Sequence, residues 1–267
     1  MQGLLRSEVF RAQKRAQSWI LVAIIVAMEV LFYGGMTIAQ AVREDNESLR
    51  ESLQVATIED NGLALFGLVG SILAVVFASS LIGSEYGWNT LRPVLARART
   101  RTALLSAKWL TALLYVAVLA VVGVLVTMVA ATVSSLVAGE GAGWSPSTLV
   151  DAVVISGRFV LGFLPLAALA LFVALVARSN AAGIAIGVAY GFVEPVVLGL
   201  LGALSDVFDT IKKGSLYWNT ERLLTLGGDN DITARDAWAS AGILALWVAL
   251  FVTISFRIFS RRDVTSG

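Results

Sequence analysis

Six long apolar runs constrain this 267-residue chain more than any other feature. They cover residues 18–38, 63–83, 103–138, 150–177, 181–204 and 238–256. Each has about 20 residues or more, the length at which a helix crosses the ~30 Å hydrocarbon core of a bilayer. Only 15% of the residues are charged, against about a quarter in soluble domains. The sequence therefore predicts an all-α integral membrane protein, with six spans in one domain.

Basic residues are distributed unevenly among the segments that separate these runs. If the N-terminus is cytoplasmic, the inner segments carry 13 Lys and Arg residues and the outer segments carry 6. Acidic residues divide the other way, with 3 inside and 14 outside. Because Lys and Arg are enriched in cytoplasmic loops, we expect both termini to be cytoplasmic. The outer loops are then residues 39–62, 139–149 and 205–237.

The N-terminal residues before the first run predict an elbow helix, over about residues 4–17, that lies along the membrane surface. At 100° per residue the side chains that share one apolar arc are Leu5, Val9, Ala12, Ala16 and Trp19. The basic residues lie outside this arc, where they would face anionic membrane lipid. A cleavable signal peptide is the alternative. The apolar core from Trp19 to Ile38 is longer than the ~7–15 residues of a signal peptide, and it contains Glu29.

The segment between the second and third runs, residues 83–110, carries the most specific pattern. Its sequence is GSEYGWNTLRPVLARARTRTALLSAKWL. Asn89 or Thr90 can cap a short helix that has Pro93 in its first turn. A short capped helix followed by arginines would suit docking onto a soluble partner. A positive-inside loop without a partner would explain the arginines, but it would not explain Glu85 and the cap.

This pattern resembles the permease subunit of six-span ATP-binding-cassette (ABC) exporters, the type-2 permease family. The family has a basic elbow, then Gly-x-Glu-Tyr-x-x-(Gly/Asn)-Thr-Leu-Arg after the second span, then a Leu-x-Arg stretch, a further Arg and a Lys. The matching positions are Glu85, Tyr86, Asn89, Thr90, Leu91, Arg92, Leu95, Arg97, Arg101 and Lys108. The ending FRIFSRRDV at 256–264 and the stretch from Trp218 to Asp231 look like the family as well. Asn89, where many members have glycine, and Pro93 are departures from the pattern.

The resemblance implies a division of labour between subunits in a prokaryotic cell membrane. Segment 84–101 would couple the spans to a cytoplasmic ABC ATPase subunit. The residues assigned to this coupling are Glu85, Tyr86, Asn89, Thr90, Leu91, Arg92, Arg97 and Arg101. A second permease copy, the same chain or a close paralogue, and a second ATPase would complete the unit.

ATP hydrolysis needs a phosphate loop that ends in Gly-Lys-Ser/Thr, and none of the four lysines stands in that setting. ATP and Mg would therefore bind the partner subunit. This chain would bind no cofactor and no nucleic acid, would contact membrane lipid, and would have no enzymatic activity of its own.

Three charged residues lie within the predicted spans, namely Glu29, Arg158 and Glu194. Charges at this depth are costly, so they face the bundle interior, paired or hydrated. We expect Arg158 to pair with Glu194 or with Glu29. A structural ion pair and a role in lining the substrate path both stay open. Pro195 should kink or end the fifth span.

Gly183, Gly187 and Gly191 recur at four-residue spacing in the fifth span. Such a glycine ladder permits the close approach of another helix. A contact within the chain and a seam between two copies both stay open.

The residue types that the chain lacks exclude several other functions. It has no cysteine and no histidine, which excludes disulfides, thiol catalysis, zinc thiolate sites and imidazole acid–base chemistry. An ion-driven secondary transporter with Glu29 and Glu194 as carriers is the main alternative, although we detect no inverted repeat. A lipid-modifying enzyme would need clustered polar residues at one surface. Residues 229–231 are the only dense set, and a solvated loop accounts for them.

Overall fold

The computed structural model describes residues 2–42, 63–91, 93–94, 100–137, 139, 146–202, 211–224 and 233–261. The helices named within these ranges are α1 (Gln2–Lys14), α2 (Ala16–Val42), α4 (Leu63–Gly87), α6 (Arg101–Val137), α7 (Pro146–Ala177), α8 (Asn180–Gly202), α10 (Leu216–Leu224) and α11 (Ala234–Arg261). Among the described residues there is no strand, and α2, α4, α6, α7, α8 and α11 are long and apolar enough to cross a membrane. The prediction of an all-α membrane protein is confirmed.

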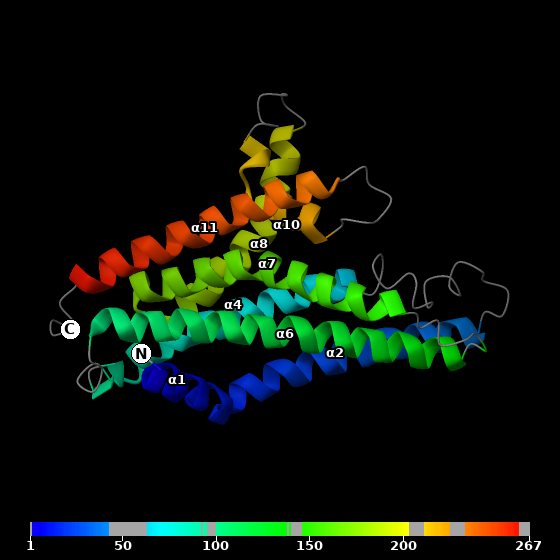
Figure 1. The fold of residues 1–267 in the computed structure, drawn as a ribbon, viewed down its shortest axis with the longest axis horizontal. Helices are drawn as coiled ribbons and strands as arrows, with labels where there is room; N and C mark the ends of the chain where they lie inside the picture. Colours follow the sequence, from blue (N-terminus) through cyan, green and yellow to red (C-terminus); the bar gives the residue numbers. More distant parts are fainter. Residues whose placement is uncertain are drawn as a thin grey trace.

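Helices α4, α6 and α7 form the centre of the bundle (Figure 1). On one side α2 packs against α6, and on the other side α8, α10 and α11 pack against α7. Helix α1 lies beside the start of α2 and packs on α6, and the last turns of α11 lie at this same end of the bundle. We call it the basic end, because it is the end at which the sequence concentrates Lys and Arg.

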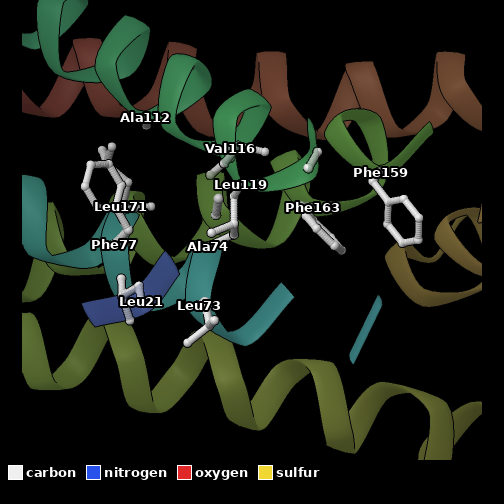
Figure 2. Close-up of a cluster of buried hydrophobic side chains, with 14 of the residues drawn as sticks. Leu21, Leu73, Ala74, Phe77, Ala112, Val116, Leu119, Phe159, Phe163 and Leu171 are labelled. Carbon is white, nitrogen blue, oxygen red and sulfur yellow. The ribbon is translucent and has the colours of Figure 1, made fainter. Parts of the chain in front are cut away.

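Aromatic and aliphatic side chains fill the space between α4, α6 and α7 (Figure 2). Phe77 of α4 stacks on Tyr115 of α6, with ring centroids 3.5 Å apart. Phe66 of α4 meets Phe159 and Phe163 of α7 edge-on, at 4.6 and 5.5 Å between centroids. Half or more of the apolar stretches of α4, α6 and α7 is buried, but less than a quarter of those of α2, α8 and α11. The outer three helices therefore offer apolar faces to lipid or to another subunit.

Helices α6 and α7 are longer than one bilayer crossing requires. They have 37 and 32 residues, which at ~1.5 Å per residue is about 55 and 48 Å. They must tilt or extend beyond the ~30 Å core. Helix α8 continues past Pro195 to Gly202, so the predicted helix end at that proline does not occur. The predicted outer loops lie mostly outside the described residues, although α10 falls within the third.

The elbow between α1 and α2 is closed by side chains of α2. Helix α1 ends at Lys14 and α2 begins at Ala16, so Arg15 alone separates the two helices. The Ser18 hydroxyl donates to the Ala12 carbonyl at 2.6 Å, and the Trp19 indole donates to the Gln13 carbonyl at 2.8 Å. These bonds satisfy carbonyl groups that a helix C-terminus leaves without partners.

The buried face of α1 differs from the predicted apolar arc. Ala12 is buried as expected, but Trp19 belongs to α2 and is 65% exposed. The prediction assumed one continuous helix through Trp19, whereas the break after Lys14 turns the later residues away. The buried face of α1 instead includes Glu8, only 3% exposed.

Threonines cap α6 and α11. The Thr100 hydroxyl accepts a hydrogen bond from the Ala103 amide at 3.1 Å, so Thr100 caps the N-terminus of α6. At α11, the Thr233 hydroxyl accepts from the Asp236 amide at 3.3 Å. The Asp236 carboxylate in turn accepts from the Thr233 amide at 3.1 Å. This reciprocal pair is a capping box with aspartate in the third position.

Candidate functional site

The predicted coupling segment, residues 84–101, starts at the turn that ends α4. Asn89 has a left-handed backbone, with φ at 55°. The Thr90 amide donates to the Glu85 carbonyl at 3.0 Å and the Asn89 amide donates to the Tyr86 carbonyl at 3.2 Å, which is a Schellman motif. Glycine or asparagine is favoured at such a position because other residues are strained there.

A new helix begins directly after this turn. The Val94 amide donates to the Thr90 carbonyl at 3.3 Å, and residues 91, 93 and 94 are helical. Of the two predicted caps, Asn89 therefore ends α4 and Thr90 precedes the next helix. Leu91 is 3% exposed and anchors this helix in the core.

Four charged side chains from three helices meet beneath the turn. Lys108 of α6 places its Nζ 2.7 Å from Glu85 Oε1 of α4 and 3.2 Å from Glu8 Oε2 of α1. The same ammonium donates to the Leu81 carbonyl at 2.7 Å. Arg11 of α1 lies 3.1 Å from Glu8 Oε1 and 3.7 Å from Glu85 Oε1. We call Glu8, Arg11, Glu85 and Lys108 the charge cluster.

The charge cluster is buried and balanced. Lys108 is 0% exposed and Glu85 is 2% exposed, so neither side chain is solvated by water. Two carboxylates face two cations, which offsets the desolvation that an isolated buried charge would suffer. Such a pair adds little net stability, but removing one partner strands the other. The cluster therefore holds α1, the end of α4 and the start of α6 in one arrangement.

The other predicted coupling residues surround this cluster. Tyr86 is half-buried, while Asn89, Thr90 and Arg101 are exposed. Arg92, Leu95 and Arg97 lie outside the residues that the structure describes. Because the Glu85 carboxylate faces Lys108 rather than solvent, a role of Glu85 in coupling would be to position the segment. The turn also exposes an aromatic side chain, Trp88, which is 68% exposed.

Sequence reasoning missed Glu8 as a member of this site. From the sequence alone it is one of the three acidic residues of the predicted inner segments, with no assigned partner. One signal could have identified it: Glu8 stands four residues before Ala12 and three after Leu5, so it interrupts the apolar face of α1. A charge on that face needs a buried partner, and Lys108, close to the start of the third span, is a cation that can supply it.

The structure does not bring Glu29, Arg158 and Glu194 together. Glu29 of α2 is 1% exposed, lies within hydrogen-bonding reach of the Thr127 hydroxyl of α6, and leaves its Oε2 without a hydrogen-bond partner among the described residues. Helix α2 packs on α6, whereas α8, which carries Glu194, packs on α7 and α4. Among the described residues, no ion pair joins Arg158 to either carboxylate, so the predicted pair is not formed.

The Glu194 carboxylate caps α10 instead. Its Oε1 accepts from the Leu216 amide at 3.0 Å and from the Tyr190 hydroxyl at 2.9 Å. Its Oε2 accepts from the Tyr217 amide at 2.7 Å. A carboxylate at a helix N-terminus satisfies free amides and the positive end of the helix dipole. Glu194 therefore fastens α10 to α8.

A Glu194→Gln substitution should destabilise the protein by roughly 1–3 kcal/mol, because one amide of α10 would then face an NH2 group rather than an oxygen. The measurement is the thermal unfolding midpoint in detergent. Asp151→Asn changes an exposed acid of α7 and serves as the control. Equal midpoints for both variants would show that the cap contributes nothing.

An apolar cavity of about 380 Å³ lies beside this cap, between α4, α7, α8 and α10. Its lining includes Phe163, Leu216 and Gly187, with Glu194 and Glu221 as its acidic members. A largely apolar cavity with few polar groups suits an apolar or amphiphilic molecule.

The glycine ladder of α8 faces other helices of the same chain. A Cβ at Gly183 would lie 2.7 Å from the Ala170 carbonyl oxygen, and one at Gly187 would lie 2.7 Å from Val75. At Gly191 the nearest atom would be 3.8 Å away, an ordinary contact. A contact within the chain, with α4 and α7, thus accounts for Gly183 and Gly187.

Gly183→Ala should destabilise the protein by roughly 1–3 kcal/mol, because a methyl group there meets backbone that cannot move aside easily. Gly191→Ala, in the same ladder, should leave the thermal midpoint unchanged or raise it, since alanine favours a helix. Unfolding of both purified variants in detergent makes the comparison. A neutral Gly183→Ala would contradict the close packing of α8.

The model of the ABC-2 family transporter protein matches residues 4–194, which run from α1 through the charge cluster into α8 and cover more than half of the chain. Comparison with curated proteins finds no match. Members of this family are multi-pass membrane subunits of ABC transporters, which associate with an ABC ATPase subunit. The chain belongs to the ABC-2 transporter family.

Proposed function

We propose that this chain is the membrane subunit of an ABC exporter, in which ATP hydrolysis by a separate subunit drives substrate across the membrane. ATP and Mg bind that ATPase subunit. The unit contains two permease copies and two ATPase copies. The basic end is cytoplasmic, because it gathers the excess of Lys and Arg.

The charge cluster is the observation that carries this proposal. Motion of an ATPase at the membrane surface can reach the spans only through an element that resists deformation. The buried contacts of Lys108 with Glu8 and Glu85 join the elbow helix and two spans at the point where the coupling segment emerges. A push on the segment therefore moves these elements together.

Trp88 and the helix that starts after Thr90 form the docking surface. Trp88 is 68% exposed, and exposed aromatic residues at a protein surface are frequent anchors of interfaces. The arginines of segment 84–101 follow Trp88 in the sequence and would contact acidic groups of the partner. Glu85 positions this surface from beneath.

The translocation path is apolar. The cavity beside Glu194 has an apolar lining, and the wide exposed faces of α2, α8 and α11 are available to lipid and to a second copy of the chain. These properties suit peptides, lipophilic drugs or lipids better than a small hydrophilic anion.

Co-expression of the tagged chain with a cassette ATPase from the same organism tests the proposal. We expect the tagged chain to retain that ATPase through purification in a one-to-one ratio, and the complex to hydrolyse ATP. An ion-driven transporter would need no such subunit and would lose activity when both Glu29 and Glu194 are replaced. Purification of the chain without the ATPase, together with activity driven by an ion gradient alone, would contradict the proposal.

A further inference from the structure

We propose that the groove between α1, the start of α2 and α6 binds one anionic phospholipid from the leaflet at the basic end. The groove has a volume of about 690 Å³. Its walls come from Val9 to Lys14 of α1, Ala16 to Val22 of α2, and Thr111 to Val118 of α6. Figure 1 shows α1 at the elbow with α2, beside the first turns of α6. The proposal requires only that the chain is embedded in a bilayer, so it is independent of the proposed transport function.

The hydroxyl groups in the groove wall already form hydrogen bonds within the protein. The Ser18 hydroxyl donates to the Ala12 carbonyl at 2.6 Å, and the Tyr115 hydroxyl donates to the Ser18 carbonyl at 2.9 Å. The Thr111 hydroxyl donates to the Ala107 carbonyl at 2.8 Å. The groove therefore offers a mainly apolar surface, which suits an acyl chain rather than a polar solute.

The apolar surface continues along α6 away from the basic end. Leu114 and Val118, which line the groove, are 47% and 52% exposed, and Val121 and Leu125 extend the same face. Their spacing of four, three and four residues places them in one row on the helix. An acyl chain that starts in the groove can therefore follow α6 into the bilayer.

A cation without a counter-ion stands at the groove. The Lys14 ammonium lies 5.6 Å from the Phe10 ring centroid and forms no ion pair with a described residue. Among the described residues that line the groove, none is acidic. Lys14 thus offers an unshared positive charge beside an apolar surface. This combination matches the net negative headgroup and the acyl chain of an anionic phospholipid.

Native mass spectrometry of the purified full chain tests the proposal, with phosphatidylglycerol and phosphatidylcholine of identical acyl chains as the probes. We expect one bound phosphatidylglycerol, with an affinity about fivefold above that of phosphatidylcholine, the effect of one lysine at a membrane surface. Lys14→Gln should abolish this preference. Lys213→Gln changes an exposed lysine beside α10 and should leave the preference intact.

A second variant separates the groove from the charge. Ala16→Trp fills the groove without altering charge and should lower the binding of both lipids. Lys14→Gln should keep the thermal midpoint of the wild type in lipid-free detergent, since its ammonium forms no ion pair to lose. Equal affinity of the wild type for the two lipids, or an unchanged preference in Lys14→Gln, would overturn the proposal.

Discussion

Replacing Lys108 with methionine should destabilise the protein by about 3–5 kcal/mol, the largest loss that we expect from a single change. Methionine fills a similar volume, but it leaves the Glu8 and Glu85 carboxylates buried with Arg11 as their remaining cation. Arg11 lies 3.7 Å from Glu85, whereas the lysine ammonium lies 2.7 Å from it. The measurement is the unfolding midpoint of the purified chain in detergent.

The control for this prediction removes the stranded charges as well. A triple variant with Lys108→Met, Glu8→Gln and Glu85→Gln carries no ionised carboxylate in the cluster, so it should regain most of the lost stability. If the triple variant were no more stable than Lys108→Met alone, the loss would come from packing, and the electrostatic account of the cluster would be wrong.

Trp88→Ala should weaken the association with the ATPase subunit by about 30-fold, the effect expected for an aromatic anchor worth about 2 kcal/mol. Trp88 is 68% exposed, so its removal should leave the unfolding midpoint of the isolated chain unchanged. The measurement is a titration of the purified ATPase onto the purified chain.

Trp238→Ala is the matched control. Trp238 is 76% exposed and stands near the start of α11, at the opposite end of that helix from the C-terminus. Its loss should not change the affinity for the ATPase. If Trp88→Ala bound the ATPase as tightly as the wild type, the turn after α4 would not be the docking surface.

The fold was predictable because length and hydropathy determine which segments can cross a bilayer. The helix boundary at Asn89 and Thr90 was predictable for the same local reason, because both residue types favour the ends of helices. Neither inference depends on where other helices lie.

The site was less predictable because its contacts join residues far apart in the chain. The sequence places Arg158, Glu194 and Glu29 within spans and predicts that Arg158 pairs with one of the two acids. The rotation of each helix about its axis and the position of α10 decide the actual partners. Glu194 binds amides of α10, a segment that hydropathy does not mark as a span. Likewise, the pairing of Glu8 with Lys108 across 100 residues follows from the packing of α1 on α6.

In the proposed transporter, ATP acts on the spans through the block that the charge cluster holds together. A spin label at Gly87 can report this motion, because a Cβ there meets no atom within 4 Å and the chain has no native cysteine. In the assembled complex, trapping ATP should change the distance between the Gly87 labels of the two copies. A control pair at Gly3 and Gly87 within one copy should keep its distance, since both positions belong to the block. An unchanged distance between copies, or a changed distance within the block, would contradict the claim.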